Sequence, residues 1–128
     1  RVVWTAEEGL SDTASPVSDG AFFLQANSEG TVSCYRAPAG DRPAAAPSAP
    51  LWTHVFEGSA FWASPVLAGG RVYLFDEKGV CHIVALGERF EAVSRCVLGE
   101  PVQASPAFAD SRIYVRGESS LFSIGRAP

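Results

Sequence analysis

The chain has 128 residues, of which 47% are hydrophobic and 19% charged, so it can bury a core as one small domain and is not disordered by composition. Its net charge is −4, without a lysine or arginine cluster, which argues against nucleic acid as a partner because phosphate binding needs concentrated positive charge. No apolar run approaches the roughly 20 residues of a membrane helix, so membrane insertion is not expected.

The chain contains no methionine and begins with Arg1. Because a translated reading frame begins with methionine, we interpret the chain as a processed product or as the C-terminal part of a longer protein. A targeting signal would then lie upstream of Arg1.

Short predicted strands follow one another in a repeating order. Residues 1–7 combine β-branched and aromatic side chains and predict a strand that ends before Gly9. The triplet Ala-Ser-Pro then occurs at 14–16, 63–65 and 104–106, and each triplet begins a further strand. Two more strands follow each triplet, at 22–25 and 31–35, at 72–75 and 80–84, and at 112–115 and 121–124. Strands at 51–58 and 90–97 close the first two repeats, which makes twelve predicted strands.

The three prolines of the triplets indicate where their strands lie. Proline has no backbone N–H, so a strand that it begins must have one unpaired edge. The innermost strand of a propeller blade has such an edge, and a repeat of about 40 residues made of short strands is typical of propeller blades. The prolines stand 49 and 41 positions apart, so we expect the three segments to line a common axis.

The predicted organisation is a single domain over residues 1–128. Blade 1 spans about 14–58 and includes a proline- and alanine-rich loop at 37–50, which we interpret as an exposed insertion. Blade 2 spans about 63–98 and blade 3 about 104–125. The third blade lacks its own outermost strand, and residues 1–7 form a strand of that type.

The repeats resemble the pyrroloquinoline-quinone (PQQ)-like propeller repeat. The resemblance is carried by the Ala-Ser-Pro triplets, by Arg-Val-Tyr-Leu at 71–74 and Arg-Ile-Tyr-Val at 112–115, by the Gly-containing turns, and by Trp4 and Trp52 in outermost strands. It implies an all-β fold: a β-propeller segment of three four-stranded blades, with the N-terminal strand acting as the outermost strand of another blade. It also suggests a periplasmic or other extracytoplasmic location.

The family includes quinoprotein dehydrogenases and non-catalytic scaffolds. The dehydrogenases place an adjacent Cys-Cys disulfide over the cofactor, whereas Cys34, Cys81 and Cys96 are not adjacent. We therefore expect no cofactor in these blades and no enzymatic activity. The predicted function is a scaffold for protein or small-ligand binding, as part of a larger protein. The alternative is a fragment of a PQQ-dependent quinoprotein dehydrogenase, which the parent sequence or added PQQ and calcium would reveal.

The predicted binding surface lies in the connections between blades. Phe61 and Trp62 stand in such a connection, and the equivalent positions in the neighbouring repeats include Asp12 and Gln103. Aromatic side chains in interblade loops are frequent binding anchors, so these four residues are the candidate ligand-binding set. The alternative is that the two aromatic residues fill space between neighbouring blades.

Other polar residues receive structural interpretations. His54 and His82 are expected on sheet faces, either solvent-facing or satisfied in the core, because no metal or Ser-His-Asp spacing accompanies them. Residues 76–79 could offer oxygen ligands to calcium but lack the spacing of a calcium loop and predict a turn. The serines of the triplets are expected to be structural, and the three cysteines to be small buried hydrophobes within strands.

The unmatched strands predict an assembly. Residues 1–7 need a blade, and the third blade needs a strand. One chain closing on itself would make three blades, below the range of about four to eight. Two copies joined head to tail would make six, so a homodimer that closes a six-bladed ring is expected if the chain is studied alone.

Overall fold

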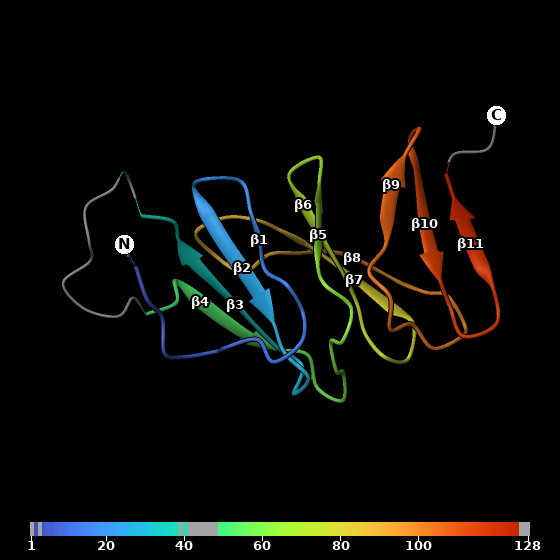
Figure 1. Ribbon diagram of the computed structural model, residues 1–128, viewed down its shortest axis with the longest axis horizontal. Helices are drawn as coiled ribbons and strands as arrows, with labels where there is room; N and C mark the ends of the chain where they lie inside the picture. Colours follow the sequence, from blue (N-terminus) through green and yellow to red (C-terminus); the bar gives the residue numbers. More distant parts are fainter. Residues whose placement is uncertain (1, 3, 39, 41–48, 126–128) are drawn as a thin grey trace.

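The computed structural model describes residues 2, 4–38, 40 and 49–125, and in these ranges it contains three antiparallel sheets arranged in a row (Figure 1). The first sheet has the order β1 (Val17–Ser18), β2 (Phe22–Ala26), β3 (Thr31–Arg36) and β4 (Trp52–Val55). The second has the order β5 (Val66–Ala68), β6 (Arg71–Phe75), β7 (Val80–Ala85) and β8 (Ala92–Val97). The third contains β9 (Ala107–Ala109), β10 (Arg112–Arg116) and β11 (Leu121–Ile124).

This arrangement confirms the predicted all-β class and the three propeller-like blades. Each sheet is a meander in which consecutive strands pair, and the third sheet has three strands among the described residues where the other two have four. We call the sheets blades 1, 2 and 3 from here on. Most of loop 37–50, namely residue 39 and residues 41–48, lies outside the described residues.

The described part of the predicted N-terminal strand has no strand structure. Residues 2 and 4–7 are described without strand structure, and residues 1 and 3 lie outside the described ranges. A β-strand requires ladder hydrogen bonds from a neighbour, and this segment lies against the face of blade 1 instead of beside a sheet edge. The Trp4 ring meets Phe23 and Tyr35 edge-on, with both centroid distances at 5.4 Å.

The triplet prolines lie where they were predicted. The strands that begin directly after Pro16, Pro65 and Pro106 are β1, β5 and β9, and each is the edge strand of its blade. At these positions the missing backbone N–H interrupts no ladder.

The triplet serines link the blades to one another. The backbone N–H of Ser15 donates to the Ser64 hydroxyl oxygen at 2.8 Å, and the N–H of Ser64 donates to the Ser105 hydroxyl oxygen at 2.9 Å. The same bond therefore joins blade 1 to blade 2 and blade 2 to blade 3. These two bonds, which we call the serine seam, hold the innermost segments side by side and give the triplet serines a structural role.

Two hydrophobic clusters fill the spaces between blades. The first, between blades 1 and 2, contains Leu24, Ala26, Val32, Phe61, Val72, Leu74 and Val84. The second, between blades 2 and 3, contains Ala63, Phe75, Cys81, Val102 and Val115. Successive side chains of a strand point to opposite faces, so the middle strands of blade 2 supply residues to both clusters.

The cysteines divide between core and surface. Cys34 and Cys81 are buried, as predicted, but Cys96 is exposed. The prediction fails for Cys96 because β8 is the outermost strand of blade 2 and is exposed along its whole length. Within the described part of the chain, no helix is long and apolar enough to cross a membrane.

Candidate functional site

The predicted binding residues lie where the interblade connections meet the turns of the blades. Figure 1 shows the β4–β5 connection beside the β2–β3 turn at the lower side of the row of blades, and the Phe61 N–H donates to the Asn27 carbonyl at 3.1 Å. The next turn is held in the same way, because the Glu77 N–H donates to the Ala60 carbonyl at 2.9 Å. The connections are therefore fixed by backbone hydrogen bonds. We call this side of the molecule the connection edge.

Trp62 is the exposed aromatic residue of the connection edge. Its side chain is 41% exposed, and its indole N–H donates to the Glu77 carboxylate at 3.3 Å. Glu77 lies in the β6–β7 turn, so the indole rests beside the turn of blade 2. The exposed part of the residue remains accessible to a partner.

Asp12 and Gln103 occupy related places beside blades 1 and 3. The Asp12 carboxylate accepts the Ser28 backbone N–H at 3.1 Å and also the Ser28 hydroxyl, and Ser28 lies in the β2–β3 turn. The hydroxyl bond is the main reason why the pKa of Asp12 is lowered. Gln103 is exposed and lines a hollow of about 190 Å³ together with Arg116 and Glu118.

Phe61 does not belong to this surface. Its side chain is fully buried in the cluster between blades 1 and 2, where it meets Phe56 edge-on at 5.7 Å. Neighbouring residues of an extended segment point in opposite directions, so the burial of Phe61 turns Trp62 outward. Of the two alternatives weighed for this pair, packing between blades applies to Phe61, while Trp62 remains available for binding.

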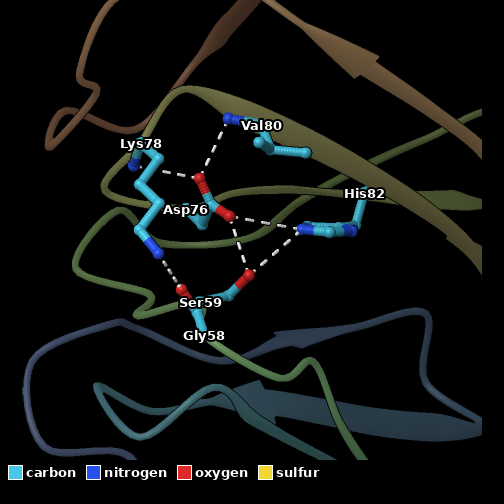
Figure 2. Close-up of polar contacts among 6 residues, drawn as sticks. All are labelled: Gly58, Ser59, Asp76, Lys78, Val80 and His82. Carbon is cyan, nitrogen blue, oxygen red and sulfur yellow. Dashed lines mark hydrogen bonds and ion pairs between the residues drawn. The ribbon is translucent and has the colours of Figure 1, made fainter.

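A second group of polar residues comes together that the sequence analysis had kept apart (Figure 2). Ser59 lies in the β4–β5 connection, Asp76 in the β6–β7 turn and His82 in β7. The Ser59 hydroxyl donates to Asp76 Oδ2 at 2.7 Å, and His82 Nε2 lies 3.4 Å from both the Asp76 Oδ2 and the Ser59 Oγ atoms. We call these three residues the Ser-Asp-His cluster.

The geometry of the cluster differs from that of a catalytic triad. In a triad the carboxylate binds Nδ1 of the imidazole, which leaves Nε2 to accept the serine proton. Here the carboxylate and the hydroxyl both approach Nε2, and the Ser59 hydroxyl donates its hydrogen bond to Asp76 and not to the imidazole. The arrangement therefore does not activate the hydroxyl as a nucleophile.

Burial lowers the pKa of His82, and the Asp76 carboxylate only partly offsets this effect. The ring also meets the aromatic rings of Phe56 and Phe61, with centroid distances of 4.3 and 5.9 Å. A neutral imidazole fits this surrounding better than a charged one. The His54 ring stacks on the ring of Phe90, with 3.8 Å between centroids. Both histidines are thus held within the structure, as the sequence indicated.

Asp76 holds the β6–β7 turn and confirms that residues 76–79 form a turn. Its Oδ1 atom accepts the backbone N–H groups of Lys78 at 3.0 Å and Val80 at 2.9 Å. The Lys78 ammonium group donates to the Gly58 carbonyl, which ties the same turn to the β4–β5 connection (Figure 2). Among the described residues, no group of three or more His, Cys, Asp and Glu side chains could hold a metal ion. We conclude that the cluster joins two segments of the connection edge.

One sequence signal could have revealed part of this arrangement. Asn27 precedes the β2–β3 turn as Asp76 precedes the β6–β7 turn, and Asn27 Oδ1 accepts the N–H groups of Glu29 at 3.1 Å and Thr31 at 2.9 Å. A short side chain with an acceptor oxygen at the same place in two repeats therefore marks the turn. The contact with Ser59 has no such signal, because it depends on how the connection folds back.

A further hollow of about 680 Å³ lies between blades 2 and 3, next to the β5–β6 and β9–β10 turns. Tyr73 and Phe108 line it and meet edge-on, with 4.9 Å between their ring centroids. None of the four predicted binding residues lies in this hollow.

The comparisons with known proteins identify no family. No family model matches the chain, and no curated protein matches its sequence. Among solved structures, 45 chains match in fold. One is BamB from Moraxella catarrhalis, with 14% sequence identity and a TM-score of 0.47, over 86% of this chain and 42% of that chain. The chain thus spans less than half the length of that protein. The three sheets themselves, and not this likeness, establish the blade architecture.

Proposed function

We propose that the chain is a non-catalytic propeller segment of the PQQ-like repeat type, whose connection edge binds a protein or a small ligand. The observation that carries this proposal is Trp62, an aromatic side chain 41% exposed on a connection that backbone hydrogen bonds hold in place. Tryptophan is enriched among the residues that dominate binding energy, and a fixed loop loses little conformational entropy when it binds.

The groups around Trp62 indicate the chemistry of the partner. Asp12, Glu77 and Glu118 place carboxylates along the connection edge, which also carries the cations Lys78, whose ammonium group donates to the Gly58 carbonyl, and Arg116, which lines the hollow at Gln103. A partner that combines an apolar group with hydrogen-bond donors would match Trp62 and the carboxylates beside it.

A peptide selection tests the proposal. A random peptide library is selected against the chain, and the enriched peptides are measured by titration against the wild type, Trp62→Ala and Val97→Ala. Val97 is also an exposed hydrophobic residue, 59% accessible, but lies on the outer strand β8. We expect Trp62→Ala to weaken binding at least about tenfold, as for a residue that contributes more than 1 kcal/mol, and Val97→Ala to have no effect. Equal binding by all three proteins would contradict the proposal.

The quinoprotein alternative has its own test. The chain is mixed with PQQ and calcium, desalted, and examined by absorbance. We expect no quinone band to remain with the protein. A band that persists after desalting would contradict the scaffold proposal and favour a dehydrogenase fragment.

A further inference from the structure

Cys81 and Cys96 stand directly opposite each other on neighbouring strands. Cys81 lies in β7 and Cys96 in β8, and the two are Cα partners in the antiparallel register. Gly79 and Leu98 stand two positions beyond this pair, and the Leu98 N–H donates to the Gly79 carbonyl at 2.9 Å. Because hydrogen-bonded pairs alternate along an antiparallel ladder, Cys81 and Cys96 are also a hydrogen-bonded pair, with Cα atoms about 5.5 Å apart. This Cα separation lies in the middle of the range that a disulfide spans, about 4.4 to 6.8 Å. The Cβ atoms of a hydrogen-bonded pair lie about 5.5 Å apart, so the two strands must approach each other by about 1 Å to reach the Cβ separation of a disulfide, about 3.5 to 4.5 Å.

The two thiols have different access to solvent. Cys81 is 1% exposed and belongs to the cluster between blades 2 and 3, whereas Cys96 is exposed on the outer strand. Directly opposite residues point to the same face of a sheet, so both thiols lie on the side of blade 2 that faces blade 3. Burial raises the pKa of Cys81, and the neighbouring Cys96 thiol raises it further. The exposed Cys96 is therefore the thiol that a reagent reaches first.

We propose that Cys81 and Cys96 are a modification site at which a cross-strand disulfide forms by exchange with a small-molecule disulfide. The Cys96 thiolate attacks one sulfur of that disulfide, which releases one thiolate and leaves a mixed disulfide on Cys96. The Cys81 thiolate then attacks the Cys96 sulfur and releases the second thiolate. The protein loses two electrons and two protons, and the reagent is reduced to two thiols.

The bond would fix the outer strand of blade 2. Strand β8 is exposed at all six positions, so side-chain burial holds it only weakly to β7. The crosslink would close a loop that contains the β7–β8 connection, and closing a loop of about 15 residues removes entropy from the unfolded chain. We expect the equilibrium constant for unfolding to fall about a hundredfold in the oxidised protein.

Cys34 supplies an internal control. It is buried in β3 on the side of blade 1 that faces blade 2, and its thiol lies 3.6 Å from the Gly87 carbonyl oxygen. Burial raises the pKa of Cys34 to about 11. Unlike Cys81, Cys34 stands opposite Leu24 and Trp52 and not opposite another cysteine, so it should remain reduced under conditions that oxidise the pair.

The test uses the wild-type chain and glutathione disulfide. After incubation the protein is denatured in acid, alkylated and digested, and its peptides are identified by mass spectrometry. We expect alkylation at Cys34 only, together with a peptide pair joined through Cys81 and Cys96. The joined fraction should not depend on protein concentration, because both thiols belong to one chain.

Two variants complete the test. Cys96→Ser, at an exposed position, should leave Cys81 open to alkylation after denaturation, and Cys34→Ser should keep the joined pair. A wild-type product with glutathione on Cys96 and a reduced Cys81 would overturn the proposal. So would a reductant-sensitive dimer joined through Cys96 of two copies. Both outcomes are read from the wild-type protein and do not depend on the folding of any variant.

Discussion

Asp76 shows how one buried side chain can organise two segments of the chain. It is 2% exposed, and its two oxygens accept backbone N–H groups of its own turn and the hydroxyl of Ser59. Asn27, at the equivalent turn of blade 1, accepts only the backbone groups of its turn with its side-chain oxygen. The carboxylate therefore adds a link to the neighbouring connection that the amide lacks.

Substituting Asp76 separates these two contributions. Asp76→Ala leaves two backbone N–H groups without an acceptor, and each such group costs about 1 to 2 kcal/mol when buried, so we expect a loss of about 2 to 4 kcal/mol in the free energy of unfolding. Asp76→Asn keeps the Oδ1 acceptor and should cost less than about 1 kcal/mol. Urea denaturation measures both values, and an equal loss for the two variants would show that the turn bonds are not the main contribution.

His82 predicts a pH dependence of stability. Its pKa in the folded protein is lowered from 6.5, chiefly by burial. The unfolded state then binds the proton more readily, so the stability present above pH 6.5 is lost as the pH falls from that value through the folded pKa.

The variant His82→Gln should lose less stability than the wild type over this interval, because it lacks the imidazole whose pKa differs between the folded and unfolded states. Asp12 and Asp19 also have lowered pKa values, but they titrate below the carboxylate value of 3.8 and therefore in a separate, more acidic window. Parallel stability curves for the wild type and His82→Gln between pH 6.5 and pH 3.8 would refute the assignment.

At the scale of the elements, a glycine allows a turn and a connection to approach each other closely, because it has no Cβ atom. Gly79 ends the β6–β7 turn with φ at +79°, and a Cβ atom there would lie 2.0 Å from the Glu100 carbonyl oxygen. Gly99 also has a positive φ, at +88°, but a Cβ atom there meets nothing within 4 Å. Substitutions at the two glycines therefore distinguish the cost of backbone strain from the cost of close contact between elements.

We expect Gly99→Ala to cost about 1 kcal/mol, for the left-handed backbone alone. Gly79→Ala should cost about 3 kcal/mol, because the connection after blade 2 must also move away. Thermal or urea unfolding of both variants measures the difference. Equal losses would mean that the connection is free to shift and does not fix the turn.

The serine seam is a second contact between elements. Ser105→Ala removes the acceptor of the Ser64 N–H, and we expect a loss of about 0.5 to 1 kcal/mol for this partly solvated bond. Ser15→Ala is the matched control, because within the described part of the chain the Ser15 hydroxyl accepts no backbone bond from another blade. A Ser15→Ala loss as large as that of Ser105→Ala, in the same denaturation experiment, would contradict a role for the seam.

At the scale of the whole molecule, the two ends of the row of blades are unlike the junctions within it. At one end β11 leaves a strand edge unpaired among the described residues, and exposed edges promote association. At the other end Trp4 contacts the face of blade 1, much as Trp52 of β4 reaches blade 2 through an indole N–H bond to the Gly87 carbonyl at 2.9 Å. The N-terminal segment therefore lies where an outermost strand of a preceding blade would lie.

We propose that the isolated chain forms a head-to-tail dimer of six blades, in which residues 1–7 of each copy complete blade 3 of the other. One chain has a mass of 13.5 kDa, and light scattering at micromolar concentration should give twice this mass. Deleting residues 1–7 should abolish the dimer and leave aggregating material, since both β11 edges then stay open. A monomeric wild type would refute the proposal, and a soluble dimer after the deletion would show that strand exchange does not join the copies.

The sequence by itself determined the features that depend on local chemistry and on repetition. Proline cannot donate to a ladder, so the three triplets predicted edge strands, and β1, β5 and β9 are such strands. The spacing of strands and turns predicted three blades, with the third one strand short. The turn-forming residue types at 76–79 predicted a turn there. Each of these inferences needs only neighbours along the chain.

The tertiary structure decided what depends on contacts between distant segments. The sequence does not say which of Phe61 and Trp62 turns inward, because either ring could fill the space between blades. It does not place Ser59 beside Asp76, or Cys81 opposite Cys96, because these pairs follow from the path of a connection and from the register of two strands. Residues 1–7 have the composition of a strand, yet a strand forms only where another sheet offers its edge.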